Sequence, residues 1–328
     1  MKRKCLRHAL VLVPLAIVAI VLSPATVAAA TIFASGQLLI PGDPGIPPGQ
    51  PGHDDSRENY VYAINTLTGT ATPVSPVTTG LPAALAGTAD QRLLGFSGGQ
   101  LRVIEPTTAV QTNIGASNGL NSTGFEILPD GRGFLLPFDA NFDTQQLFSI
   151  DITTGVAAPI SSSATEIGDA IDTAAGNPLG TAEPFLISLG AVGNTLYGVD
   201  LDTDSLISLD PDTGAASVVG AVGAVGSVTN GPFSYSGLSA LTGVDENEDG
   251  QFDALFGAVN FIDDGTGSQR LGGVARYDLT DGTWQLVGTN PGVIFFGFGS
   301  SPVPEPSTLT LFAGLGLITL TRRTMRRS

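Results

Sequence analysis

The sequence has very little of the side-chain chemistry on which most catalytic sites rely. Of its 328 residues, one is a cysteine and two are histidines. Cys5 and His8 lie in an N-terminal segment that we predict to be removed, which leaves a body with no cysteine and one histidine, His53. Thiol catalysis and thiolate metal sites are therefore excluded from the body. A Ser-His-Asp triad would have to use His53, which lies in a Pro/Gly-rich segment.

Basic residues are also scarce, and they are concentrated at the two ends of the chain. Between Arg7 and Arg322 there are six arginines, no lysine and all 30 acidic residues, so this part carries a net charge of −24. Proteins that bind nucleic acid or other phosphate-rich partners rely on clusters of lysine and arginine. We therefore expect no nucleic-acid partner. The acidic surface is explained by solvation or, more specifically, by cation binding.

The first thirty residues match a bacterial export signal. Four basic residues lie within the first seven positions, an apolar run follows from Ala9 to Leu22, and Ala28 and Ala30 supply small residues before Thr31. This is the three-part order of a cleavable signal peptide. The apolar run is shorter than the ~20 residues that a spanning helix needs, so a retained anchor is the weaker alternative. The sequence predicts a signal peptide at residues 1–30 and an exported body.

The body, residues 31–300, has the pattern of an all-β domain. The chain holds 43 glycines and 22 prolines, and 13% of its residues are charged, which is about half the usual share. Short runs of Val, Ile, Leu and Phe are separated by Gly, Asp, Asn and Thr. Helical periodicity is nearly absent. These features favour strands joined by turns.

A repeat within the body narrows the fold further. In each unit a strand ends in an acidic or Asn residue, a turn of the Thr-Gly type follows, and another strand begins. The acidic or Asn side chain can accept hydrogen bonds from the turn, where Gly adopts a positive φ without steric cost. The five strands that end in such a residue are 60–65, 101–105, 147–151, 206–210 and 274–278.

Units of roughly 40–50 residues with three to four strands are typical of a β-propeller. We therefore predict a β-propeller of five or more blades, with a β-sandwich or an irregular solenoid as the alternative. A degenerate sixth or seventh unit could lie between Glu166 and Pro184 or near Ser227–Leu241. The repeats resemble those of bacterial extracellular propellers. The fifth unit includes Asp281–Trp284, which we interpret as another turn, with a packed tryptophan.

The strongest candidate for a ligand site is an acidic loop with oxygen-bearing side chains at alternate positions and Gly250 at the sharp turn. Ca²⁺ prefers several oxygen ligands at about 2.3–2.6 Å. We predict a calcium site; a plain acidic turn is the alternative. The predicted ligands are the side chains of Asp245, Asn247, Asp249 and Asp253 and the backbone carbonyl of Gln251.

The residue at the twelfth position of this loop is Phe256, where an EF-hand has a bidentate Glu. The loop leads directly into an apolar strand beginning at Ala254. In this order it resembles the FG-GAP repeats of integrin-type propellers, and also the loops of thrombospondin type 3 and dockerin modules. The resemblance implies a calcium-binding loop between two strands of a propeller.

The last 28 residues form a second targeting segment, 301–328. The motif Val303, Pro304, Glu305 and Pro306 precedes an apolar run, Thr308–Thr321, which we expect to form a short transmembrane helix. Four basic residues follow as a membrane stop on the cytoplasmic side. They are Arg322, Arg323, Arg326 and Arg327.

This order resembles the PEP-CTERM sorting domain. The resemblance implies processing by an exosortase-type enzyme, a temporary membrane attachment, and a location in the cell envelope, on the outer surface or in the extracellular matrix of a Gram-negative-type bacterium. Fourteen helical residues span about 21 Å, which is short of a ~30 Å hydrocarbon core. The short span suits retention before processing better than permanent anchoring.

Two functions remain open from the sequence. The first is a non-catalytic surface propeller for adhesion, scaffolding or glycan binding, with extracellular polysaccharide as a possible partner. The second is a calcium-dependent, carboxylate-based hydrolase or lyase that acts on polysaccharide or a lactone. We favour the first, because no acid/base pair can be named and a fold alone does not imply activity. Three or more carboxylates around a central metal would favour the second, and a channel lined by Gly, Ala and Val would argue against it.

Overall fold

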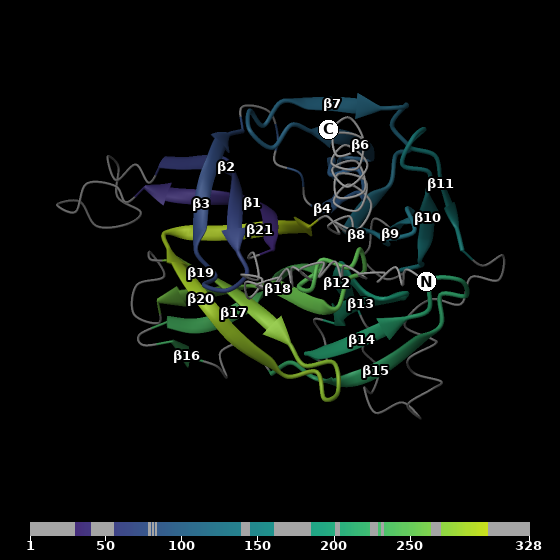
Figure 1. The fold of residues 1–328 in the computed structure, drawn as a ribbon. Helices are drawn as coiled ribbons and strands as arrows, with labels where there is room; N and C mark the ends of the chain where they lie inside the picture. The colour runs from purple at the N-terminus through teal and green to yellow at the C-terminus, as the bar shows by residue number, and fades with distance from the viewer. Residues whose placement is uncertain are drawn as a thin grey trace, which may run out of the picture.

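The chain folds as a ring of five small antiparallel sheets. The computed structural model describes residues 30–40, 56–77, 80, 82, 84–138, 145–160, 185–200, 204–223, 229–230, 233–263 and 270–300. Within these ranges the regular structure consists of β-strands. Figure 1 shows the sheets arranged as blades around a common centre.

Four of the blades follow one another along the chain, and each is built from consecutive strands that run in order from the centre of the ring to its outside. Blade one consists of β4 (Ala84–Gly87), β5 (Leu93–Ser97), β6 (Gln100–Ile104) and β7 (Gln111–Ile114). Blade two consists of β8 (Asn121–Ile127), β9 (Gly133–Phe138), β10 (Phe148–Ile150) and β11 (Ala157–Pro159). Blade three consists of β12 (Leu186–Val192), β13 (Thr195–Asp200), β14 (Ser205–Leu209) and β15 (Ala216–Ala221). Blade four consists of β17 (Phe233–Val244), β18 (Ala254–Asp263), β19 (Arg270–Tyr277) and β20 (Trp284–Pro291), with the short β16 (Thr229–Asn230) beside β17.

Blade five joins the two ends of the body. Its inner strand is β21 (Val293–Ser300), and its outer strands are β1 (Thr31–Ile40), β2 (Ser56–Asn65) and β3 (Ala71–Pro76). In the antiparallel pairing of β1 with β21, Ile32 lies opposite Ser300. The last strand of the body thus closes the ring against its first.

The inner strands confirm the propeller prediction. Each contacts the inner strands of the two adjacent blades, in the ring order β4, β8, β12, β17, β21 and back to β4. The described part therefore forms a β-propeller with five blades, and the sandwich and solenoid alternatives are wrong. The segment near Ser227–Leu241 contributes β16 and β17 to blade four rather than a further blade. Residues 166–184 lie outside the described part.

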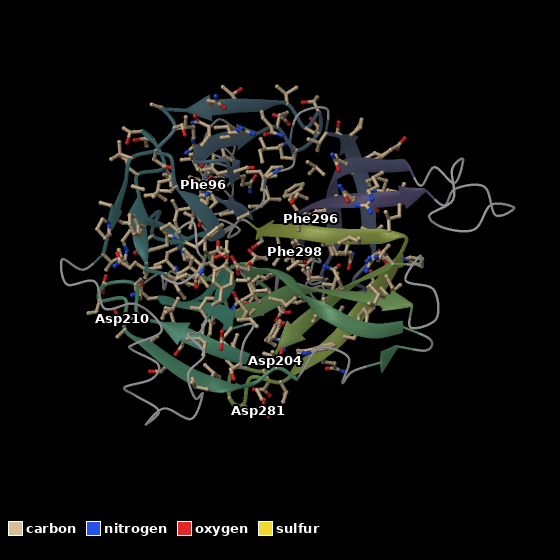
Figure 2. The ribbon with its side chains drawn as sticks, turned by 180° about the vertical axis from the view of Figure 1, so that it is seen from behind. Phe96, Asp204, Asp210, Asp281, Phe296 and Phe298 are labelled. Atoms are coloured by element: carbon tan, nitrogen blue, oxygen red, sulfur yellow. The ribbon has the colours of Figure 1, made fainter. Side chains whose placement is uncertain are left out.

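The predicted turns occur once in each blade, between its third and fourth strands. In every one, the turn residue with positive φ donates its N–H to the carbonyl of an acidic or Asn residue at the end of the third strand or directly after it, over 2.7–2.9 Å. Figure 2 shows two of the acidic strand-end and turn residues, Asp210 and Asp281, at the rim of the ring. The five pairs are Gly69 with Asn65, Ala109 with Glu105, Gly155 with Asp151, Gly214 with Asp210, and Gly282 with Asp278.

The side chain of this acidic or Asn residue also caps the turn, as the sequence predicts. The carboxylate of Asp151 accepts N–H bonds from Thr153 and Thr154 at 2.8 and 3.2 Å and a hydroxyl bond from Thr153 at 2.6 Å. These hydrogen bonds, with the Thr153 hydroxyl first, lower the pKa of Asp151 to about 2. The turn is therefore held locally by an ionised side chain.

Glycines let these turns pack against the neighbouring blade. A Cβ atom on Gly220 of β15 would lie 1.7 Å from the carbonyl oxygen of Asp281 in the turn of blade four. A Cβ on Gly288 of β20 would lie 2.1 Å from the carbonyl of Thr68 in the turn of blade five. These turns therefore approach the outer strand of the preceding blade at a distance that only glycine permits.

We expect Gly220→Ala and Gly288→Ala each to lower the free energy of unfolding by about 1–3 kcal/mol, the usual cost of forcing atoms into a filled contact. Thermal and urea unfolding would measure the loss. Gly80→Ala is the matched control, because no atom lies within 4 Å of its added Cβ. Wild-type stability in the two contact variants would show that the blades do not depend on this close approach.

Candidate functional sites in blade four and the central channel

The acidic loop predicted to bind calcium connects the inner strand of blade four to its second strand. Asp245 follows the last residue of β17 and is 1% exposed. Asp253 precedes β18, and its N–H donates to the carbonyl of Val244 over 3.0 Å. The loop therefore begins and ends at paired positions of a β-hairpin.

Hydrogen bonds between its own side chains and backbone hold the loop. The two carboxylate oxygens of Asp245 accept N–H bonds from Asp249 (3.1 Å) and Gly250 (2.9 Å). Asn247 Oδ1 accepts from Asp249 N–H (3.0 Å), and Asp249 Oδ1 accepts from Gln251 N–H (2.9 Å). Gly250 has a φ of 84°, so the predicted sharp turn lies at this glycine.

The oxygen chemistry of the loop suits calcium, but its side chains do not converge. Asp253 Oδ1 accepts an N–H bond from Glu246 at 2.8 Å, away from the amides that bind Asp245. Within the described ranges, no three acidic, histidine or cysteine side chains gather closely enough to hold a metal ion. The predicted ligands thus share one loop, and N–H groups bind both carboxylate oxygens of Asp245 and one side-chain oxygen each of Asn247, Asp249 and Asp253.

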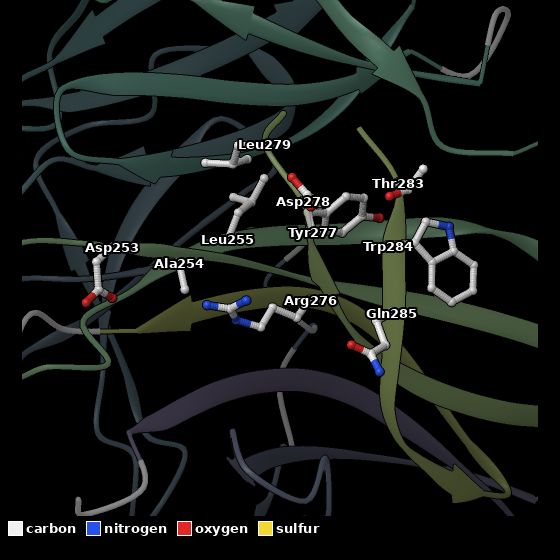
Figure 3. A pocket seen from close by; sticks show the side chains of 10 residues that line it. All are labelled: Asp253, Ala254, Leu255, Arg276, Tyr277, Asp278, Leu279, Thr283, Trp284 and Gln285. Atoms are coloured by element: carbon white, nitrogen blue, oxygen red, sulfur yellow. The ribbon is translucent and has the colours of Figure 1, made fainter. Parts of the chain in front are cut away.

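A cavity of about 420 Å³ opens beside this loop and shares Asp253 with it. Figure 3 shows that its side chains come from the start of β18 and the residue before it, the end of β19, the turn that follows, and the start of β20. Its rim mixes carboxylates with an arginine, an amide and aromatic rings. The lining residues are Asp253, Ala254, Leu255, Arg276, Tyr277, Asp278, Leu279, Thr283, Trp284 and Gln285.

Arg276 is the positively charged residue among those that line this cavity. Its guanidinium forms two hydrogen bonds with the carboxylate of Glu246, at 3.2 and 2.8 Å. This pairing with Glu246, reinforced by the charges of Asp253 and Asp278, raises the pKa of Arg276. Three carboxylates thus surround one guanidinium. Because Arg276 is about half exposed, the pair contributes little to stability.

Trp284 connects the same region to blade three. Its indole Nε1–H donates to the carbonyl of Val222 over 2.8 Å, and the ring is partly buried. It is the first residue of β20 and lies opposite Tyr277. The segment Asp281–Trp284 is therefore the fifth turn with a packed tryptophan, as the sequence predicts.

The inner strands meet at the centre through glycine and alanine. A Cβ on Gly124 of β8 would lie 2.7 Å from the backbone nitrogen of Leu189 in β12, and one on Gly299 of β21 would lie 2.8 Å from that of Ala86 in β4. A Cβ on Gly243 of β17 would lie 2.1 Å from a carbonyl oxygen of β12. These small residues let the inner strands approach to backbone contact.

A fully buried carboxyl group, Glu126 of β8, lies among these strands. Its Oε1 accepts the N–H of Ile127 at 2.9 Å, and its Oε2 accepts the N–H of Gly243 in β17 at 3.2 Å. Complete burial raises the pKa of Glu126 to about 8, although these N–H groups and the hydroxyl of Thr242 favour the ionised form. The sequence analysis missed this residue. Its only signal was an acidic residue inside an apolar strand.

Ser300 extends this network to blade five. Its N–H donates to Thr242 Oγ1 over 3.2 Å, and its hydroxyl donates to the carbonyl of Gly243. Blades two, four and five are thus joined by polar contacts near the ends of β8, β17 and β21. The last residue of the body is fixed at the point where the sorting segment begins.

Residues 1–29 of the predicted signal peptide, His53, the sorting motif and the four terminal arginines lie outside the described residues. In the part of the chain that the structure describes, no helix is long and apolar enough to span a membrane.

The fold defines a β-propeller with a short segment after its closing strand, and comparison with protein families characterises that segment. Residues 302–327 match the PEP-CTERM protein-sorting motif. The predicted sorting tail is thereby confirmed. The chain carries the signal of an exported, cell-envelope-associated protein of a Gram-negative-type bacterium, with an exosortase-type enzyme as its processing partner.

Comparison with curated protein sequences gives no match. Among solved structures, a nidogen/laminin complex has a chain with 12% identity and a TM-score of 0.41, over 84% of this chain and 99% of that one. A putative TolB from Agrobacterium tumefaciens has 12% identity and a TM-score of 0.39, over 83% and 93%. The calcium-binding protein regucalcin from the same organism has 16% identity and a TM-score of 0.36, over 83% and 80%.

We expect Glu126 to make the propeller less stable as the pH rises. The pKa of this carboxyl is about 8 in the folded chain against an ordinary 4.5. The contribution of the protonated carboxyl group to the free energy of unfolding is therefore complete below about pH 4.5. It then falls by up to about 1.4 kcal/mol per pH unit until about pH 8. Glu126→Gln should remove this slope.

The test compares the free energy of urea unfolding of wild type and Glu126→Gln at pH 5 and pH 8. From pH 5 to pH 8, the free energy of unfolding of the wild type should fall relative to that of Glu126→Gln. Glu105→Gln, which removes an exposed carboxylate, controls for the loss of one charge. A difference independent of pH would mean that Glu126 is ionised in the folded chain.

Proposed function

We propose that this chain is a non-catalytic β-propeller that is delivered to the cell surface or extracellular matrix and serves there in adhesion, scaffolding or glycan binding. Residues 1–30 would be a signal peptide, residues 31–300 the propeller, and residues 301–328 the sorting and anchor segment. The described strands support these boundaries, since they begin at Thr31 and end at Ser300.

The observation that carries the non-catalytic reading is the near absence of carboxyl groups from the described inner strands of the ring. A calcium-dependent propeller hydrolase or lyase would gather several carboxylates around a channel metal. The five described inner strands contain one carboxylate, Glu126, which is fully buried and bonded to backbone N–H groups. Glycine contacts bring the surrounding strands together. This arrangement supports a structural centre and favours ligand binding on the outer surface.

The cavity of blade four is suited to a glycan. A sugar offers hydroxyl groups and an apolar ring face, and the lining combines Arg276, Gln285 and Asp253 with the partly exposed Trp284. Few ligand sites of this size exist in one protein, and a concave site with several polar groups is the default binding hypothesis.

A binding assay on a panel of polysaccharides tests this proposal, with product release measured in the same samples. We expect binding without product release. Gln285→Ala should weaken binding several-fold by removing one of the polar contacts, while Arg92→Ala, an exposed change in blade one, should leave it unchanged. Equal binding by both variants would show that the polysaccharide does not bind in this cavity. Product release would favour the calcium-dependent hydrolase or lyase.

We also propose that the loop Asp245–Asp253 binds calcium, with a small rearrangement that turns its oxygens toward the ion. The type and spacing of the oxygen ligands support this, as does a backbone that already turns at Gly250. The ion would rigidify the connection between β17 and β18. Its role would be structural.

Wild-type protein should melt at a higher temperature in millimolar Ca²⁺ than in EDTA, since a ligand at 100 times its Kd stabilises by about 2.7 kcal/mol. Asp249→Ala should abolish the difference. Glu248→Ala is the matched control, because it removes a carboxylate from the same loop at a position between the predicted ligands. If EDTA leaves the wild-type melting temperature unchanged, the loop is only a turn.

A further inference from the structure

Both ends of the body leave the propeller on the same side. Contacts between neighbouring inner strands advance in the same direction along both strands. In β8 and β12, Thr123 bonds to Leu186 and the next residue, Gly124, lies against Leu189. In β17 and β21, Ser239 bonds to Phe295 and Thr242 bonds to Ser300. The inner strands are therefore parallel, and their C-terminal ends lie on one face. Thr31 lies there too, because the next residue pairs with Ser300.

We name this side the turn face. It consists of the connections that follow the inner strands and the turns between third and fourth strands, because both occur at the same end of an antiparallel sheet. The segments are 65–70, 88–92, 105–110, 128–132, 151–156, 193–194, 210–215, 245–253 and 278–283.

The sorting motif lies very close to this face along the chain. Glu305 is five residues beyond Ser300, so it is at most about 17 Å from the end of β21 even when the chain is fully extended. Ser300 itself cannot move outward without breaking its hydrogen bonds to Thr242 and Gly243. An enzyme that acts at the motif must therefore approach the turn face closely.

The turn face is strongly acidic. Its segments contain 13 acidic residues and two arginines, Arg92 and Arg132. Arg132 is already paired with Asp130 and Asp212, at 2.8 and 2.6 Å. Within the ~8 Å Debye length of physiological salt, a protein surface that comes this close experiences a negative potential. A basic surface is attracted by this potential, and an acidic one is repelled.

Exposed apolar side chains lie on the same face. Leu67, Val110 and Val156 are 60–67% exposed, more than the other exposed large hydrophobic residues of the described part. Val110 and Val156 occupy the same place in their blades, directly after the turn residue with positive φ. Apolar side chains among charged ones are suited to contact with another protein.

We propose that the turn face is the docking surface for the exosortase-type processing enzyme, which presents a basic surface to it. This proposal rests on the sorting function proposed for the tail. The enzyme would recognise the motif together with the face behind it, so that removal of the tail depends on the folded propeller.

The experiment follows removal of the tail from the full-length chain over time, in cells that carry the processing enzyme. Val110→Lys/Val156→Lys adds two positive charges to the turn face at exposed positions. Val74→Lys/Val218→Lys makes the same chemical change at exposed positions on the outer strands β3 and β15. We expect the first variant to be processed at least about threefold more slowly, through weaker electrostatic attraction, and the second at the wild-type rate.

A spacer provides a second measurement. A Gly/Ser insertion of about 12 residues between Ser301 and Pro302 adds on the order of 20 Å of reach, so the enzyme no longer has to meet the turn face. It should restore the processing rate of Val110→Lys/Val156→Lys. Both double variants should bind polysaccharide and unfold like wild type, which separates docking from folding.

Three outcomes would overturn the proposal. Equal processing of the two double variants would show that the turn face is not contacted. Faster processing of Val110→Lys/Val156→Lys would indicate attraction to an anionic membrane surface instead of to an enzyme. Failure of the spacer to restore the rate would place the defect elsewhere. If wild type itself keeps its tail, the sorting function fails, which is a separate result.

Discussion

The pairing of β21 with β1 is the interaction on which the rest of the structure depends. It joins the last strand of the body to the first and supplies the inner strand of blade five. Without it, β1 and the inner strands of blades one and four would expose unpaired backbone groups or apolar faces to water. Because the ring closes at this strand, the sorting segment begins directly after a residue, Ser300, that is hydrogen-bonded to β17.

Close approach of backbones is the second constraint, and glycine makes it possible. At the centre, Gly124 and Gly299 bring neighbouring inner strands together; at the rim, Gly220 and Gly288 receive the turns of the next blade. A composition rich in glycine is often associated with flexibility. In this protein these glycines allow tight contact between rigid blades. The same contacts hold neighbouring blades in fixed positions, which keeps the turns on one face of the ring.

Much of the fold could be predicted from the sequence because its repeating signal is local. The turn after Asp151 depends on hydrogen bonds that span two to four residues, so the same short sequence pattern can be recognised in every blade. The acidic loop could be recognised for the same reason. Whether its side chains converge on one point could not be predicted from the sequence. The direction of each carboxylate depends on which N–H groups bind it in the folded loop. Glu126 was missed, since its burial comes from strands far away in the chain.

The sequence by itself determined the class of fold, the five turns, the acidic loop and the sorting tail, because each is encoded by neighbouring residues whose chemistry acts at short range. The tertiary structure alone decided the number of blades in the described part and the partner of β21. It also decided that Thr31 and Ser300 share one face and that a carboxyl group lies at the centre. These features arise when strands distant in sequence pair and exclude water, and such pairings depend on the shape of the whole ring.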